Sequence, residues 1–362
     1  YFTNNGPLVR ELEAAVAQMH GVNHCVAVCN ATIGQLLVLK ALELEGEIIM
    51  PSFTFVATAH SCLWNNIRPV FCDIDPKTLM IDAKKVEELI TEKTCAVFGV
   101  HLFGNICEVE ELASICRENN LKLVFDAAHA FLCTLGGRLV GGFGNAEILS
   151  FHATKFFSTF EGGAVLTNDT DLYNRVRFQK NFGFSDYDDV GFLGINGKMS
   201  EPAAAMGLAS LPMMESRSSR FKEEYAIYCE KLGQLEGINI LAVGENGHSN
   251  FRYIVILVDE EPLGISRDLL YRILWKENVI ARRYFYPGCH RLEPYISLYP
   301  DTYKRLPVTE NISKKVLCLP TNLNDPQKEI QTIAEIIETV HENADELNQW
   351  KERKNQWKEK NL

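Results

Sequence analysis

A lysine and an aspartate, each closing a short apolar segment, are the residues whose types and order suggest covalent chemistry. Lys155 ends the segment Ser150-Phe-His-Ala-Thr-Lys155, and Asp126 ends the run Leu121-Lys-Leu-Val-Phe-Asp126. Burial behind an apolar strand lowers the pKa of a lysine and frees its amine to form a Schiff base. Taken singly, Lys155 could be a surface lysine and Asp126 a helix cap. Their order, each after a strand, favours one shared pocket.

An acid and a lysine facing one pocket supply the two contacts that pyridoxal 5′-phosphate needs, a partner for its pyridinium nitrogen and an anchor for its aldehyde. A phosphate site is predicted at Asn30-Ala31-Thr32-Ile33-Gly34, where a strand turns into an apolar helix and backbone N–H groups would face an anion. Thr32 could instead only cap that helix. Ser150 could add a hydroxyl, Phe55 could stack on the ring unless it belongs to the core, and His129 could lie over the ring.

These residues need a scaffold that brings the ends of several strands together. From Cys25 to Asn168, short apolar runs alternate with segments whose apolar residues recur three and four positions apart, the pattern of strands and amphipathic helices. We therefore predict an α/β fold with a mostly parallel sheet, covered on both faces, that binds ligands at the carboxyl ends of its strands. The predicted strands are 25–29, 47–50, 69–73, 95–100, 121–126, 148–151 and 164–167.

The second part of the chain is predicted to form a smaller α+β unit. A charged helix over 214–235 leads to strands at 252–258 and 316–319 and helices at 267–275 and 327–340. We expect a large domain over 1–220 and a small C-terminal domain over 221–362, ending in a charged helical tail at 341–362. Leu347, Trp350 and Trp357 are the large apolar residues of that tail. The glycines of 136–144 do not have the spacing of a dinucleotide-binding loop and predict a tight hairpin.

Composition excludes several classes of protein. Hydrophobic residues make up 46% of the chain and no stretch approaches a membrane span, which needs roughly eighteen apolar residues. The net charge of −11 argues against a nucleic-acid surface. The 11 cysteines are scattered, so we expect reduced thiols, no metal site and a cytoplasmic protein without a signal peptide. Because the chain begins at Tyr1 rather than methionine, we expect that residues precede it.

Together these segments resemble the sugar aminotransferases of the DegT/DnrJ/EryC1/StrS family, which have the type I pyridoxal-phosphate aminotransferase fold. The resemblance covers nearly the whole chain. Its segments are 3–8, 51–58, 100–104, 126–129, 150–163, 194–201, 282–287 and 319–320.

The resemblance implies a role for each matching residue. Lys155 would be the Schiff-base lysine and proton shuttle, and Asp126 would keep the pyridinium nitrogen protonated. Asn196 matches an asparagine that reaches the phosphate of the neighbouring subunit's cofactor, which implies a homodimer with shared active sites. The other positions implied for the cofactor are Ala31, Thr32, Phe55, His129 and Ser150, and those implied for the substrates are Glu161, Lys198 and Tyr284.

Two positions depart from the family pattern. Ala31 stands where glycine is common, so the phosphate turn must accept a Cβ atom. Lys198 stands where arginine is frequent, so a bidentate contact to the carboxylate of the amino donor would become a contact to a point charge.

The reaction implied by the resemblance is transfer of the amino group of L-glutamate to C4 of a nucleotide-linked 4-keto-6-deoxy sugar, with ping-pong kinetics. We expect dTDP-4-dehydro-6-deoxyglucose as the sugar and lipopolysaccharide O-antigen as the product's use. Amination at C3 and a non-enzymatic sensor that binds pyridoxal phosphate are alternatives. A nicotinamide-dependent oxidoreductase shares the alternating pattern but would need the glycine fingerprint.

Overall fold

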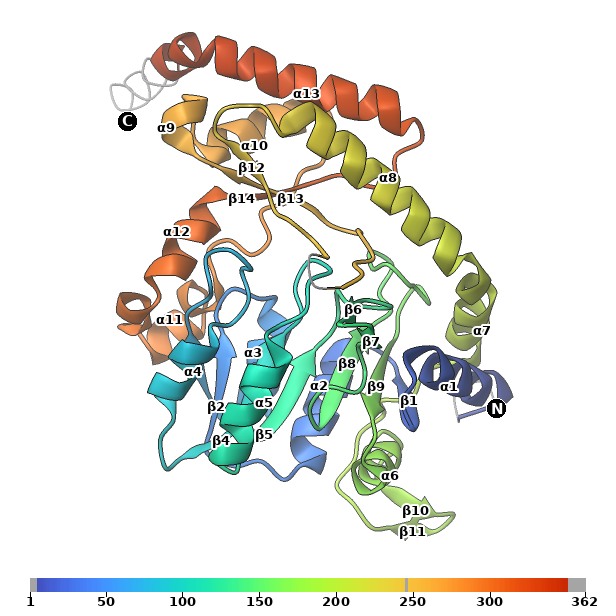
Figure 1. Ribbon diagram of the computed structural model, residues 1–362. Helices are drawn as coiled ribbons and strands as arrows, with labels where there is room; N and C mark the ends of the chain where they lie inside the picture. Colours follow the sequence, from blue (N-terminus) through green and yellow to red (C-terminus); the bar gives the residue numbers. More distant parts are fainter. Residues whose placement is uncertain (1–4, 245–246, 351–362) are drawn as a thin grey trace, which may run out of the picture.

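A central sheet of seven strands forms the larger part of the molecule (Figure 1). The structure, a computed structural model, describes residues 5–244 and 247–350. Within them the strands lie in the order β1-β9-β8-β5-β4-β2-β3. All neighbours are parallel except that β9 is antiparallel to both β1 and β8. The strands are β1 His24–Val28, β2 Glu47–Pro51, β3 Arg68–Cys72, β4 Thr94–Val100, β5 Lys122–Asp126, β8 Ala146–Ser150 and β9 Gly163–Thr167. The prediction of a mostly parallel α/β sheet is confirmed.

Helices cover both faces of this sheet. Helices α2 (Ala31–Ala41), α3 (Val56–Trp64) and α6 (Thr170–Gln179) pack on one face in one apolar core. The opposite face carries α1 (Pro7–His20), α4 (Ala83–Leu89), α5 (Val109–Glu118) and α7 (Glu201–Ser210) in a second core. Burial on both faces explains why the strands read as continuous apolar runs rather than alternating ones.

Helix α2 begins directly after the first strand because Asn30 caps it. The Asn30 side chain accepts a hydrogen bond from the N–H of Ile33 at 2.9 Å. The alternative in which Thr32 caps this helix is therefore wrong. Thr32 lies inside the first turn, where the backbone N–H groups have no acceptor within the helix.

A smaller antiparallel sheet follows in the second part of the chain. It consists of β12 (Ile238–Ile240), β13 (Ile254–Val258) and β14 (Val316–Leu319). Helix α8 (Met214–Leu232) runs from α7 beside the large sheet up to this smaller one (Figure 1). Its C-terminal half packs with α10 (Arg267–Lys276) and α13 (Pro326–Glu342) in a third core. The remaining helices are α9 (Glu260–Leu263), α11 (Tyr295–Leu298) and α12 (Pro307–Lys315).

Two features of the second part of the chain differ from what the sequence predicted. The strand predicted from residue 252 begins at Ile254, so Arg252 and Tyr253 precede it. Residues near α11 return to the large sheet, because Cys289, Tyr295 and Leu306 are buried in the core of its α2 face.

Several local predictions can be checked directly. Strands β6 (Thr134–Leu135) and β7 (Arg138–Leu139) form the expected hairpin, with Gly136 and Gly137 at φ of 54° and 80°, as a type I′ turn requires. The tail is helical over 344–350, and the rest of it, with Trp357, lies outside the described residues. All cysteines are free thiols.

Neither a metal site nor a membrane span is found in the described ranges. There, no group of three or more His, Cys, Asp or Glu side chains could hold a metal ion. No helix of residues 5–244 and 247–350 is long and apolar enough to cross a membrane.

Candidate active site

The ends of several strands meet along one edge of the large sheet. Ser150 at the end of β8 is opposite Gly163 of β9, and Gly163 is opposite Val28 at the end of β1. Asp126 ends the neighbouring strand β5. The loop from β8 to β9 carries Lys155, so the acid and the lysine reach the same edge, as predicted.

A cavity of about 780 Å³ opens at this edge. Its far wall comes from residues 252–253, 280–285 and 318–321, which belong to the second part of the chain. Asn196 and Lys198 do not line it. The predicted site residues that do are Ala31, Thr32, Phe55, Asp126, His129, Ser150, Lys155, Glu161 and Tyr284.

The Asp126 carboxylate is buried and held in place by three donors. Its Oδ2 atom accepts hydrogen bonds from Gln35 Nε2 at 2.7 Å and Thr58 Oγ1 at 2.8 Å. Its Oδ1 atom accepts one from the N–H of Ala128 at 3.0 Å. Because a carboxylate has about four acceptor positions, one remains for a further N–H donor in the cavity.

The Lys155 amine lies in an environment that favours its neutral form. Burial lowers the pKa of Lys155 from 10.5 to about 8, and the nearby Asp126 carboxylate opposes this shift. Its Nζ atom lies 3.4 Å from the hydroxyl of Tyr253, to which it can donate. A lysine with this pKa can act as a nucleophile or a base near neutral pH.

His129 is neutral and stacked rather than free to move. Burial lowers its pKa well below 6.5, and the positive charges of Lys155 and Arg252 lower it further. Its Nδ1 atom accepts the N–H of Phe103 at 3.3 Å, so Nε2 carries the ring proton. Its ring packs on that of Tyr253 with centroids 4.1 Å apart.

The N-terminus of α2 opens onto the same cavity, with Ala31 and Thr32 in its wall. Strand β9 approaches this turn closely, since a Cβ atom on Gly163 would lie 2.7 Å from the Ala31 nitrogen. A Cβ atom on Gly162 would lie 2.2 Å from Thr159 Oγ1. The absence of a side chain at Gly163 therefore lets β9 pack against the N-terminus of α2, and its absence at Gly162 leaves room for Thr159.

The rim of the cavity carries exposed groups. Phe55 precedes α3 and is 58% exposed, so its ring is not part of the core. Glu161 Oε1 lies 3.5 Å from His152 Nε2 at the same opening. Tyr284 is half-buried on the opposite wall.

Comparison with known proteins decides the family. A family model described as the DegT/DnrJ/EryC1/StrS aminotransferase family matches residues 1–338. The chain belongs to this family. It is a sugar aminotransferase that depends on pyridoxal 5′-phosphate, as the sequence motifs predicted.

Individual relatives cover most of the chain. A dTDP-4-amino-4,6-dideoxy-D-glucose transaminase of Shigella dysenteriae is 39% identical over 319 residues, 88% of this chain and 86% of that protein. A GDP-perosamine synthase of Caulobacter vibrioides is 32% identical over 344 residues, 93% of this chain and 91% of that protein. The crystal structure of DesI with its TDP-sugar product superposes with a TM-score of 0.91 at 43% identity, covering 97% of this chain and 89% of that one.

The residues present fit the cofactor of this aminotransferase family. Asp126 keeps one acceptor position for the ring nitrogen, and the buried Gln35 Oε1 beside it has no hydrogen-bond partner within the described part of the chain. Lys155 can anchor the aldehyde. The first turn of α2, with Thr32 and the Ser150 hydroxyl, can bind the phosphate.

Several cavity residues of the aminotransferase were not found by sequence reasoning. Gln35 and Thr58 orient Asp126, and Arg252 and Tyr253 lie near Lys155. A glutamine on the buried side of an apolar helix was a signal that could have been read. Arg252 and Tyr253 gave a weaker signal because they looked like the start of a strand.

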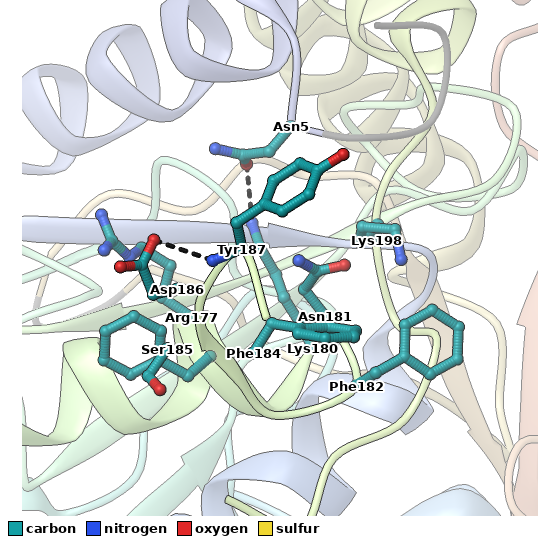
Figure 2. Close-up of a pocket in the computed structure, with 11 residues that line it drawn as sticks. Asn5, Arg177, Lys180, Asn181, Phe182, Phe184, Ser185, Asp186, Tyr187 and Lys198 are labelled. Atoms are coloured by element: carbon teal, nitrogen blue, oxygen red, sulfur yellow. Dashed lines mark hydrogen bonds between the residues drawn. The ribbon is translucent and has the colours of Figure 1, made fainter. Parts of the chain in front are cut away.

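Asn196 and Lys198 lie elsewhere in the subunit, beside a hairpin of β10 (Phe184–Asp186) and β11 (Asp189–Val190). Asn196 forms a β-bridge with Asn181, and Lys198 Nζ lies 4.4 Å from the centre of the Phe182 ring. Figure 2 shows this second, open cavity of about 590 Å³, with Lys198 and Phe182 side by side. Neither residue contributes to the Lys155 cavity of its own subunit.

Proposed function

We propose that this aminotransferase moves the amino group of L-glutamate to C4 of a thymidine-diphosphate-linked 4-keto-6-deoxy sugar, dTDP-4-dehydro-6-deoxyglucose. The observation that carries the proposal is the meeting of Lys155 and Asp126 in one cavity with the α2 N-terminus. The name of the Shigella relative, a 4-amino-4,6-dideoxyglucose transaminase, and the TDP-sugar product bound to DesI support the choice of substrate.

Each residue of the cavity has a task in this reaction. When bound, pyridoxal phosphate carries the amino group between the substrates and withdraws electrons from the carbon that is deprotonated. Asp126 holds a proton at the pyridine nitrogen. Lys155 takes a proton from the donor's Cα atom and later returns one to C4 of the sugar. Phe55 would stack on the cofactor ring, and Thr32 and Ser150 would hold its phosphate.

One pocket must serve both substrates in turn, because Lys155 is the proton carrier in both half-reactions. Ping-pong kinetics are expected for such an arrangement. Glu161 and Tyr284 lie at opposite walls, and we assign them to contacts with the sugar.

We also propose a homodimer in which Asn196 reaches the cofactor phosphate of the other subunit. Asn196 lies outside its own subunit's cavity, beside a run of exposed apolar side chains, and exposed apolar patches mark interaction sites. The exposed residues of this run are Phe182, Phe184, Tyr187, Val190, Leu193 and Ile195.

Three broader assignments remain proposals. We assign 1–220 to a large domain that binds the cofactor and 221–362 to a small domain. Residues near Tyr295 belong to the small domain by sequence but pack in the core of the large sheet. The free thiols are consistent with work in the reducing cytoplasm. The 4-amino sugar would be used in a lipopolysaccharide O-antigen.

The decisive experiment offers the purified protein L-glutamate with several nucleotide-linked keto sugars and determines the position of nitrogen in the product by NMR. Release of 2-oxoglutarate with nitrogen at C4 of the thymidine-diphosphate sugar is expected. Nitrogen at C3 would replace the proposal by the C3 alternative. Cofactor binding without 2-oxoglutarate from any sugar would favour the non-enzymatic sensor.

A further inference from the structure

Arg252 is a cation in the cavity without a carboxylate partner. It lines the wall opposite the large sheet, and among residues 5–244 and 247–350 its guanidinium forms no ion pair with an acidic side chain. Some other arginines of the second part are paired, such as Arg267 and Arg283 with Asp268, whereas Arg282 of the same cavity lies over the Trp275 ring. An unpaired guanidinium beside a substrate cavity is a ready site for an anion.

Neutral contacts fix the position of this guanidinium. Arg252 Nε donates to the carbonyl oxygen of Thr154 at 3.1 Å, and Nη1 donates to the hydroxyl of Thr321. The guanidinium also lies over the rings of Phe221 and Tyr253. These contacts orient the guanidinium but leave its charge uncompensated. An anion could therefore bind to a donor that is already held in position.

Arg252 lies close to the reacting end of the cavity. Thr154, whose carbonyl it binds, directly precedes Lys155 in the chain. The charge of Arg252 is near enough to lower the pKa values of both Lys155 and His129.

The proposed reaction has two anionic groups that Arg252 could bind, the α-carboxylate of the amino donor and the diphosphate of the acceptor, and the position of Arg252 favours one of them. The α-carboxylate of an amino-acid donor is bonded to the carbon that Lys155 deprotonates, so its cation must lie near Lys155. The diphosphate of the acceptor is bonded to C1, across the sugar ring from the reacting C4. The position of Arg252 therefore suits the carboxylate rather than the diphosphate.

We infer that Arg252 binds the α-carboxylate of the amino donor. The inference rests on the proposed function, because it assumes an amino-acid donor.

The test measures carboxylate binding without turnover. Glutarate, a dicarboxylate that lacks the amino group, is titrated into the cofactor-loaded enzyme, and its Kd is determined by calorimetry. Arg252→Gln should raise this Kd by about 10- to 100-fold, the range for a charge-assisted hydrogen bond, and Arg252→Lys should raise it less. Arg117→Gln, at the exposed end of α5, is the matched control and should leave it unchanged.

Two further readouts separate a binding role from a structural one. Guanidinium ions should restore glutarate binding to Arg252→Ala, which they would not do if the variant were misfolded. The Kd of dTDP should change less than twofold in Arg252→Gln. An unchanged glutarate Kd, or a weakened dTDP Kd with intact glutarate binding, would overturn the inference.

The outcome is distinguishable from failure of the proposed function. Glutamate is first added to the unmodified enzyme, and the shift of the cofactor's visible absorbance is recorded. No shift would remove the proposed donor and this inference with it. A shift together with normal glutarate binding by Arg252→Gln would remove only the inference.

Discussion

Lys155 destabilises the protein when the cofactor is absent, because folding buries an amine that is charged in the unfolded chain. Its pKa falls from 10.5 to about 8 on folding. Between these values the unfolded state binds a proton that the folded state has lost, so the free energy of unfolding rises with pH in this window. Below about pH 8 the full cost is present, up to about 3 kcal/mol.

Lys155→Met should therefore stabilise the cofactor-free protein while abolishing transamination. At pH 7 the variant should be more stable by up to about 3 kcal/mol, and the difference should shrink towards pH 10. Urea unfolding of both proteins at the two pH values measures this. Lys84→Met, on an exposed face of α4, should change stability by about 0.5 kcal/mol or less. Equal stability of Lys155→Met and the parent at pH 7 would show that Lys155 is well solvated.

The order of residues along the chain predicted Lys155 and Asp126 because both follow strands whose ends must share a sheet edge. It did not predict Arg252 and Tyr253, which reach the cavity from the segment that precedes β13. Local patterns of apolar residues do not predict which distant segments of the chain come into contact. The cap of α2 is a local contact between Asn30 and Ile33, and the sequence alone did not decide between Asn30 and Thr32 because asparagine and threonine are both favoured caps.

At the scale of elements, β9 approaches the start of α2 so closely that position 163 has no room for a side chain. Local patterning predicted the β9 strand but not its antiparallel direction, because a buried apolar run reads alike in both directions. Because β9 runs beside β8, a Cβ atom added to Gly163 would also lie 2.8 Å from the Leu149 carbonyl oxygen.

Gly163→Ala should weaken both the fold and cofactor binding. The added methyl must push β9 away from α2, which costs about 1–3 kcal/mol, and it displaces the turn assigned to the phosphate. Thermal unfolding and the Kd of pyridoxal phosphate are the measurements. Gly142→Ala is the matched control, because its Cβ would meet only Asn168 Nδ2 at 3.6 Å. If both variants bind the cofactor equally well, the close approach does not shape the phosphate site.

A buried network ties the segment around residue 290 to the loop after β2. Ser52 Oγ lies 2.7 Å from His290 Nδ1, and His290 Nε2 lies 2.6 Å from Glu310. Arg291 donates two hydrogen bonds to the same carboxylate. The Arg291 guanidinium, with His290, lowers the pKa of Glu310 from 4.5 to about 2.

Glu310→Gln should destabilise the protein by about 1–2 kcal/mol at pH 7, after allowance for screening by water. The carboxyl has a lower pKa in the folded state, so its contribution is complete above about pH 4.5 and is lost as the pH falls towards 2. Guanidinium chloride unfolding at pH 7 and at about pH 3 should show the difference reduced to less than half. A difference that is independent of pH would assign the effect to packing instead.

At the scale of the whole molecule, the proposed dimer makes each active site depend on two chains. Lys155 and Asp126 come from one subunit and Asn196 from the other. The sequence indicated this arrangement only through the family resemblance, because no local pattern identifies the surface on which two copies meet.

Mixed dimers can test the shared site. Lys155→Ala and Asn196→Ala enzymes should each be weakly active, because every site lacks one residue. Unfolded and refolded together, they should recover roughly a quarter of the parent activity, since half of the dimers are mixed and each has one intact site. Size-exclusion chromatography confirms the assembly. Activity that never exceeds the average of the two variants would place Asn196 and Lys155 in independent roles.

The wall of the cavity is divided by chain position, with lining residues between 30 and 161 on one side and between 252 and 321 on the other. In the assignment proposed above, the first segment holds the cofactor, carries the proton on Lys155 and contributes Glu161 to the sugar contacts, while the second contributes Arg252 and Tyr284 to the substrate contacts. A change at Tyr284 could therefore alter one of the proposed sugar contacts while Lys155 and Asp126, on the opposite wall, keep their places.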